Sequence, residues 1–446
     1  MKVNVIVKAD KKDSFAPKLS TGEERIFLES IFSEATSIYV THNIKPLVEK
    51  LPLIPQGGVE DFGNLSLAVY VIDQLLSRTA YGYQGWSRYF KIFIPVVDVP
   101  VWNNQISQIE SMLSFLTGDK WEVEFRQRKA AEIQSTVYNG LVSHVSLFSG
   151  GLDSLIGTID LLSHYSEIAL ISHHKGGGGG EKSTQASLVS ELQNAYPAKK
   201  INSNLFYVQP LKGDKNLGGE NTQRARSLMF IALGLLVANG YGKTTTLLIP
   251  ENALISLNIP LTMSRYGTYS TKTTHPKFIE TVSDLLSALS IGNRIDNPYK
   301  FKTKGEMLKD CADQSLIQRI AYSSTSCSKT NYYKRWTKKT KTSRDIASHC
   351  GHCVPCIIRR SAFYSIGADR FEGNYHVDVQ QKSNSDYSDL RAFKIGLHRF
   401  NKKKKLTIFD IFKGGIFSFN SGSEMTNYLK VYQRGMKEVE KFIYKR

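Results

Sequence analysis

The spacing of apolar residues changes near residue 140. Before that point, Val3, Val5 and Val7 alternate with polar residues as in a strand, and residues 106–116 show helical spacing that ends at Gly118. From His144 onward, strand-like apolar runs alternate with helical patterns. We expect these strands at Val145–Phe148, Ile168–Ser172, Leu205–Val208 and Thr246–Ile249. Such alternation predicts an α/β fold with right-handed crossovers and a doubly wound parallel sheet covered on both faces.

The chain is therefore expected to have four parts. They are an accessory α/β domain (1–135), the doubly wound domain (136–320), a metal-binding part of that domain (321–375) and a basic, largely helical extension (376–446). In the first part, Phe90–Val101 is apolar but interrupted by Pro95 and Pro100, which predicts an edge or irregular strand. In the last part, Ser421 begins a capping-box pattern before an apolar helical face.

A glycine-rich turn follows the first strand of the doubly wound domain: Ser149-Gly150-Gly151-Leu152-Asp153-Ser154. A turn of this kind leaves backbone N–H groups free at a helix N-terminus, which favours an anion and above all phosphate. The glycines allow close approach of the backbone to a ligand, and the two serine hydroxyls add donors. The turn also lies at the carboxyl edge of the strands, where ligands bind in such sheets. An ordinary strand–helix turn capped by Asp153 or Ser154 is the alternative interpretation.

Charge and cysteine usage narrow the possible functions. The formal net charge of +18 favours a polyanionic partner such as a nucleotide, a nucleic acid or an acidic protein. The sequence has no apolar run of 18 residues and no signal-peptide pattern at its start, so we expect a cytoplasmic protein. Three of the five cysteines form Cys350-x-x-Cys353-x-x-Cys356, which favours a metal site over disulfides.

The three clustered cysteines need a fourth ligand. Cys327 is the expected one because it lies near the cluster in chain order, and four thiolates would give the closed tetrahedral shell of structural Zn²⁺. His349 and His352 are rival ligands, and an iron–sulfur cluster is the other metal interpretation. Cys311 has apolar neighbours at helical spacing and is expected to be an inert core thiol.

Further polar residues follow the other predicted strands. The run Gly176–Gly180 is either a mobile lid or a plain flexible loop. Arg224 and Arg226 open a long apolar helix, where they form either a phosphate or carboxylate clamp or a solvated cap. Four residues are candidate substrate ligands: Arg224, Asn252, Lys272 and His275.

Three blocks, taken in order, resemble the 7-cyano-7-deazaguanine synthase (QueC-like) family of pyrophosphate-loop (PP-loop) ATP pyrophosphatases. They are Ser149–Ser154, then Lys304-Gly305-Glu306 with Ser326-Cys327, then residues 350–359 with their Cys-Gly-x-Cys-x-x-Cys-x-x-Arg pattern. The resemblance covers about residues 144–375. Where the family has Tyr-Pro-Asp-Cys-Arg, this chain has Thr273-Thr274-His275-Pro276. It looks more like the larger members with extra domains, found in bacterial anti-phage operons of the Qat (QatC-like) and cyclic-nucleotide signalling types.

The resemblance implies ATP-dependent chemistry. The family adenylates a carboxylate on a purine-like substrate, releases pyrophosphate and transfers the activated group to an amine. By resemblance, Ser149–Ser154 bind the ATP phosphates, with the amides of Gly150, Gly151 and Leu152 stabilising the departing pyrophosphate. Asp153 is expected to hold Mg²⁺, and Arg226 and Lys304 to assist pyrophosphate departure. ATP, Mg²⁺ and Zn²⁺ are thus the expected cofactors.

The acceptor amine belongs either to ammonia or to a partner protein of the same defence system. The extra N-terminal domain, the altered segment 273–276 and the basic C-terminal region favour a protein, because a protein acceptor needs a docking surface. Two alternatives remain. A PP-loop tRNA-modifying enzyme would explain the charge but needs a basic RNA path and a catalytic cysteine pair, neither of which is evident. A non-catalytic nucleotide-binding scaffold is disfavoured by the intact loop.

Overall fold

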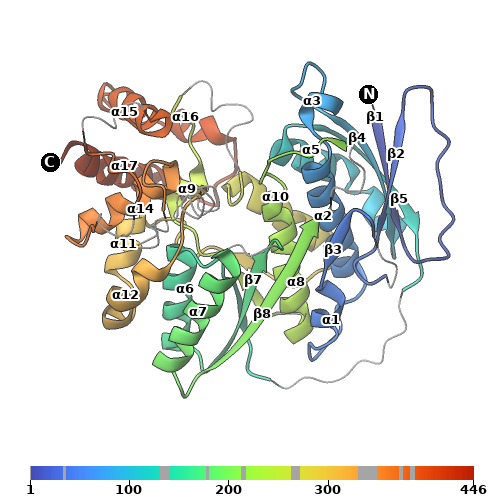
Figure 1. Cartoon of the computed structure of the whole chain (residues 1–446), viewed down its shortest axis with the longest axis horizontal. Coiled ribbons are helices and arrows are strands. Elements are labelled where there is room, and N and C mark those ends of the chain that lie inside the picture. The colour runs from blue at the N-terminus through green and yellow to red at the C-terminus, as the bar shows by residue number, and fades with distance from the viewer. Residues whose placement is uncertain are drawn as a thin grey trace, which may run out of the picture.

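The computed structural model describes most of the chain. The described residues are 2–33, 37–130, 140–176, 180–211, 217–262, 272–329, 349–370, 375–381 and 387–445. They form two sheets side by side, and helices α2 and α8 lie between the sheets (Figure 1). The C-terminal helices gather beyond the second sheet. The predicted mixed α/β fold with parallel strands and a helical C-terminal part is confirmed.

The first sheet consists of four parallel strands in the order β2-β1-β4-β5. The strands are β1 (Lys2–Lys8), β2 (Glu24–Glu29), β4 (Tyr89–Val96) and β5 (Lys120–Gln127). The helices of this region are α1 (Ile44–Val48), α2 (Gly58–Leu75), α3 (Arg78–Tyr81), α4 (Val99–Asn103) and α5 (Ile106–Thr117). Helix α5 ends as predicted at Gly118, whose φ of 77° lies in the left-handed region that favours glycine.

Strand β4 is an interior strand, so the expectation of an edge or irregular strand was wrong. It pairs with β1 over Tyr89–Phe93 and with β5 over its whole length. Pro95 lies beyond the last residue that pairs with β1, so its missing N–H does not interrupt that ladder. Pro100 lies in the first turn of α4, where a backbone N–H has no intrahelical partner.

The second sheet has the order β10-β9-β6-β7-β8-β3 and is parallel except for β3. Its strands are β3 (Val40–His42), β6 (His144–Leu147), β7 (Glu167–His174), β8 (Lys200–Pro210), β9 (Thr246–Leu248) and β10 (Ile295–Asp296). The helices of this part are α6 (Leu152–His164), α7 (Gly180–Ala195), α8 (Arg226–Tyr241), α9 (Ala253–Leu257) and α10 (Pro276–Ala288). Helices α6 and α7 lie on one face and α8 on the other (Figure 1), which is the arrangement that the alternating pattern predicted.

Residues before 135 share their packing with the second sheet. Strand β3 pairs antiparallel with the end of β8, from Val40 opposite Pro210 to His42 opposite Val208. Helix α2 packs on α8 and on β4, and all of its residues except Gly58 and Gln74 are buried. One apolar core therefore runs through both sheets and includes residues of the segment 1–135, for which the sequence predicted a separate unit.

The C-terminal part is helical. Its α-helices are α11 (Lys304–Lys309), α12 (Gln314–Ile320), α14 (Val354–Ser365), α15 (Ser388–Asn401), α16 (Ile408–Ile411) and α17 (Gly422–Tyr444). Helix α17 packs on α14 and α9 through its apolar face. Ser421 caps it by accepting a hydrogen bond from the Glu424 N–H at 3.2 Å, as the sequence indicated. No helix in the described part of the chain has the length and apolarity needed to cross a membrane.

Candidate phosphate loop and metal centre

The loop Ser149–Ser154 connects the interior strand β6 to helix α6 at the carboxyl edge of the second sheet. Gly150 has a φ of +81°, a conformation that favours glycine. The Ser154 hydroxyl donates to the Gly151 carbonyl at 3.0 Å, and it lies 3.3 Å from the Ser149 hydroxyl. These contacts fix the turn before the helix begins.

A second segment supports this loop from outside. The Leu152 N–H donates to the Ser326 hydroxyl at 3.1 Å, and the Thr325 N–H donates to the Gly150 carbonyl at 2.8 Å. The Gly151 N–H donates to the Ser149 hydroxyl at 3.3 Å. The contacts of Thr325 and Ser326 with the loop were not predicted from the sequence, in which their position beside Cys327 was the available signal.

A cavity of about 180 Å³ opens in front of the loop. Loop residues form one wall, and Glu251, Lys304 and Ser326 contribute to the others. Whole small-molecule sites usually measure about 300–1,000 Å³. The cavity therefore suits a few phosphate groups rather than an entire nucleotide.

An ion pair closes one side of the cavity. The Lys304 Nζ lies 3.0 Å from Asp153 Oδ1, and both side chains are buried. The other carboxylate oxygen of Asp153 accepts hydrogen bonds from Asn252, from Nδ2 at 2.7 Å and from the backbone N–H at 3.2 Å. Burial alone would raise the pKa of Asp153, but Lys304 and the hydrogen bonds outweigh it and hold that pKa below its ordinary value. Asp153 is therefore ionised at neutral pH.

Glu251 brings a second carboxyl group to the same cavity. Burial and the neighbouring Asp153 carboxylate hold the pKa of Glu251 well above its ordinary value. Glu251 consequently keeps a proton under conditions in which Asp153 has lost its own, and paired carboxyl groups in opposite states are typical of acid–base sites. The sequence signal for Glu251 was its position soon after β9 at the carboxyl edge.

The geometry of Asp153 does not fit the expected role as a direct Mg²⁺ ligand. One of its oxygens faces the Lys304 ammonium and the other is held by Asn252. A divalent cation at this carboxylate would meet an ammonium group of like charge. We therefore derive no step through a metal ion bound to Asp153.

The two predicted arginines lie outside the residues that line the cavity. Arg226 is the first residue of α8; its Nε lies 3.3 Å from His173 Nδ1, and its Nη1 lies 3.9 Å from Glu181. The Arg224 guanidinium donates to the Thr117 carbonyl at 2.8 Å, toward the first sheet. Arg226 is thus at the end of β7, one strand from the loop, whereas Arg224 bridges the two halves of the molecule.

Of the other three predicted substrate ligands, only Asn252 contacts Asp153 beside the cavity. Lys272 lies over the Phe115 ring, with Nζ 3.8 Å from the ring centroid. His275 is fully buried, and its Nδ1 accepts a hydrogen bond from the Lys277 N–H at the start of α10. Burial and then Lys272 lower the pKa of His275 to about 3. His275 is a neutral helix cap and is not among the residues that line the cavity.

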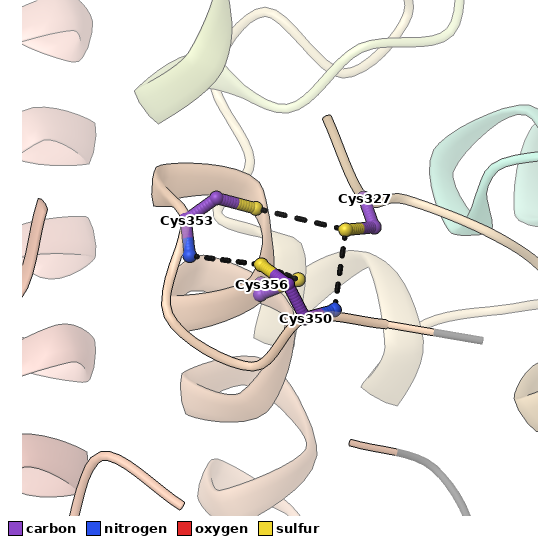
Figure 2. A group of neighbouring side chains, drawn as sticks. All are labelled: Cys327, Cys350, Cys353 and Cys356. Atoms are coloured by element: carbon purple, nitrogen blue, oxygen red, sulfur yellow. Dashed lines mark hydrogen bonds between the residues drawn. The ribbon is translucent and has the colours of Figure 1, made fainter. Parts of the chain in front are cut away.

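The four predicted zinc cysteines converge in the structure. Figure 2 shows Cys350 and Cys353 on the turn that enters α14 and Cys356 in the first turn of that helix, with Cys327 on a separate segment. All four sulfur atoms lie within 4.8 Å of one another. The distance is 4.0 Å between Cys327 and Cys353 and 3.8 Å between Cys350 and Cys356. A tetrahedral shell with Zn–S bonds of about 2.3 Å places the sulfurs about 3.8 Å apart, so the group can hold Zn²⁺.

Backbone groups support the sulfur cluster. The N–H groups of Cys350 and Lys329 each lie 3.3 Å from the Cys327 sulfur, and the Cys353 N–H lies 3.3 Å from the Cys350 sulfur. Such donors stabilise thiolate ligands. Gly351 has a φ of +88°, and a β-carbon there would collide with the Val377 carbonyl. The turn therefore requires glycine at this position.

The rival ligands lie elsewhere. His349 Nε2 accepts a hydrogen bond from the Ser326 N–H at 3.2 Å, and His352 stacks on Tyr387. Among the described residues, the one group able to bind a metal consists of the four cysteines. Cys311 is buried in the apolar core, where burial raises its pKa to about 12, as expected for an inert thiol.

The role of the five-glycine run Gly176–Gly180 stays a prediction. Residues 177–179 of the five-glycine run lie outside the described residues, so the choice between a lid and a plain loop stays open.

No family model matches the sequence, and no curated protein matches it. A functional assignment therefore rests on the geometry of the loop, the cavity and the cysteine cluster.

Proposed function

We propose that the protein is an AMP-forming enzyme that uses ATP to activate the carboxylate of a 7-deazaguanine. The enzyme then transfers the activated acyl group to an amine. The observation that carries this proposal is the cavity shared by the glycine-rich loop and Lys304. Helix α6 begins at this loop, and helix N-termini favour anions. Lys304 brings a buried ammonium group to the same cavity, where it is paired with Asp153 of the loop.

The residues of the cavity match the electrostatic demand of the proposed reaction. When the carboxylate attacks the α-phosphorus, the bond to the β-phosphate breaks and negative charge moves to the departing pyrophosphate. The N-terminal end of α6 and the Lys304 ammonium would stabilise that charge in a partly buried site. Removal of one oriented donor typically costs about 3 kcal/mol of barrier, or roughly a hundredfold in rate.

The cysteine cluster is assigned a structural role in this proposal. Its four sulfur ligands would leave Zn²⁺ no open coordination position for a water or substrate. The cluster instead fixes Ser326, the neighbour of Cys327, against the Leu152 amide. Zinc would thus keep the loop in shape without taking part in the chemistry.

The product pattern tests the proposal. Purified protein with ATP, Mg²⁺ and a 7-deazaguanine carboxylate should form AMP and pyrophosphate. Ser154→Ala removes the hydroxyl that closes the loop and should slow the reaction at least tenfold, whereas Ser163→Ala at the far end of α6 should not. ADP and phosphate as products would exclude the proposal, and nucleotide binding without turnover would favour the scaffold alternative.

The same assay addresses the acceptor. Ammonia as acceptor would give a small-molecule amide or nitrile. A protein acceptor would instead gain the mass of the activated group, which intact-mass spectrometry of proteins from the same operon would detect.

A further inference from the structure

Lys304 occupies the first position of helix α11, and a capping box fixes its backbone. The Thr303 hydroxyl accepts a hydrogen bond from the Glu306 N–H at 3.1 Å, and the Glu306 carboxylate accepts one from the Thr303 N–H at 2.9 Å. The cap sets the direction in which the helix starts. It does not explain how α11 is held relative to the loop.

Glu438, more than one hundred residues further along the chain, holds α11 in place. Glu438, on the C-terminal helix α17, accepts a hydrogen bond from the Thr303 hydroxyl at 2.7 Å and another from the Gly305 N–H at 3.2 Å. Its carboxylate therefore contacts the residues on both sides of Lys304. A β-carbon at Gly305 would collide with Glu438 and with the Ser365 hydroxyl, so the absence of a side chain permits this close approach.

A second residue of α17 holds the same helix. Arg434 lies one turn before Glu438, on the same face of α17. Its guanidinium pairs with the Glu306 carboxylate and donates to the Phe301 carbonyl at 2.9 Å. Helix α17 also packs along α14, which contains the metal-site residue Cys356 and is preceded directly by Cys353. The C-terminal helix thus connects α11 to the metal centre.

We propose that Glu438 is a positioning residue of the active site, which holds Lys304 against Asp153 through Thr303 and Gly305. The inference rests on the proposed function, because it assigns the C-terminal helix a part in the same reaction. The Lys304 ammonium group pairs with Asp153. Glu438 of α17 accepts a hydrogen bond from the N–H of the next residue, Gly305, and so holds the backbone beside Lys304. A displacement of about 1 Å at a reacting site can cost about a hundredfold in rate.

Two measurements test this inference with matched variants. Glu438→Ala removes both acceptors, Glu438→Gln keeps one acceptor, and Glu440→Ala removes a carboxylate of the same helix that contacts Asn401 instead. We expect Glu438→Ala to lower kcat for AMP formation at least tenfold, with the KM for ATP changed less than threefold. Glu438→Gln should recover part of that loss, and Glu440→Ala should behave as wild type. Equal kcat values in a folded Glu438→Ala protein would overturn the inference and leave the proposed function standing.

The second measurement does not depend on activity. A double-mutant cycle of Asp153→Asn, Lys304→Met and the double variant gives the coupling free energy between Asp153 and Lys304, measured from the free energies of unfolding. In the Glu438→Ala background this coupling should fall by at least half, and in the Glu440→Ala background it should not change. An unchanged coupling in Glu438→Ala would overturn the inference. Wild-type protein that forms no AMP would overturn the proposed function, and the coupling would still decide the role of Glu438.

Discussion

The Leu152 N–H donates to the Ser326 hydroxyl at 3.1 Å, and Ser326 directly precedes the metal-site residue Cys327. The buried Arg359 adds a second link, because its guanidinium donates to Ser324 at 2.8 Å and lies 3.5 Å from the Ser326 hydroxyl. Loop and metal centre are therefore one connected structure, although about 175 residues separate them in the sequence. The shape of the loop should consequently depend on the metal.

We predict that Cys353→Ser abolishes zinc binding and destabilises the protein. Structural zinc contributes on the order of 10 kcal/mol of binding energy to folding in small sites. Measurement of the metal content of purified protein should give one zinc per chain for wild type and for Cys311→Ala, and none for Cys353→Ser. Zinc that persists in Cys353→Ser but disappears in Cys311→Ala would contradict the assignment.

Zinc removal should also weaken nucleotide binding. A chelator that strips the cluster frees the segment 325–327, and the Leu152 amide loses its partner. Calorimetric titration with a non-hydrolysable ATP analogue should show at least tenfold weaker binding by the stripped protein and recovery after zinc is restored. Unchanged affinity in metal-free, folded protein would show that the loop does not need the cluster.

The pair formed by Asp153 and Lys304 should matter for stability. Asp153→Ala leaves a buried ammonium group without its counter-ion, which typically costs about 3–5 kcal/mol. Asp310→Ala is the matched control, because the pair of Asp310 with Lys302 is solvent-exposed and such pairs contribute about 0–1 kcal/mol. Chemical denaturation measures the free energy of unfolding of both variants. Equal losses would show that the buried pair contributes no more to stability than the exposed pair.

Stability should also depend on pH through Glu438. Burial raises the pKa of Glu438 to about 7, from an ordinary value of 4.5. A raised carboxyl pKa means that the folded protein binds the proton more tightly than the unfolded chain does. The stabilisation is therefore complete below pH 4.5 and is lost as the pH rises to about 7, with a slope of at most about 1.4 kcal/mol per pH unit. Glu438→Gln should flatten the stability profile between these pH values, whereas Glu440→Gln should keep the wild-type slope.

Removal of the N-terminal region should expose the core. A chain that begins at residue 140 lacks β3 and α2, so the apolar face of α8, with Leu228 and Leu235, loses its cover. We expect this fragment to aggregate or to remain associated with chaperones. Size-exclusion chromatography and thermal unfolding provide the test, and a soluble monomer with cooperative unfolding would restore the idea of a separate accessory domain.

Local patterns explain which features the sequence predicted correctly. The alternation around β6 and α6 located the loop, and the spacing Cys350-x-x-Cys353-x-x-Cys356 located most of the metal site. Both signals are short-range, because the relevant residues lie within one turn of each other.

Long-range contacts explain what the sequence did not predict. No local pattern pairs Asp153 with Lys304 or places Glu438 beside Gly305. Pro95 suggested an edge strand because sequence does not show where the β1 ladder ends. His275 and Lys272 looked accessible because their packing against Phe115 depends on how the two halves of the protein meet.

The burial of α2 between the first sheet and α8 has a consequence for synthesis on the ribosome. Helix α2 is complete at residue 75, but its partner α8 begins only at residue 226. At about 5–20 residues per second, translation of that interval takes roughly 8–30 s. During this time one of the most apolar helices of the chain has no partner on its α8 side. Strand β3 is without its pairing partner, the end of β8, for slightly longer. The nascent chain should therefore need a holding chaperone such as one bound near the exit tunnel, and mutations that slow translation before residue 226 should lower the yield of soluble protein.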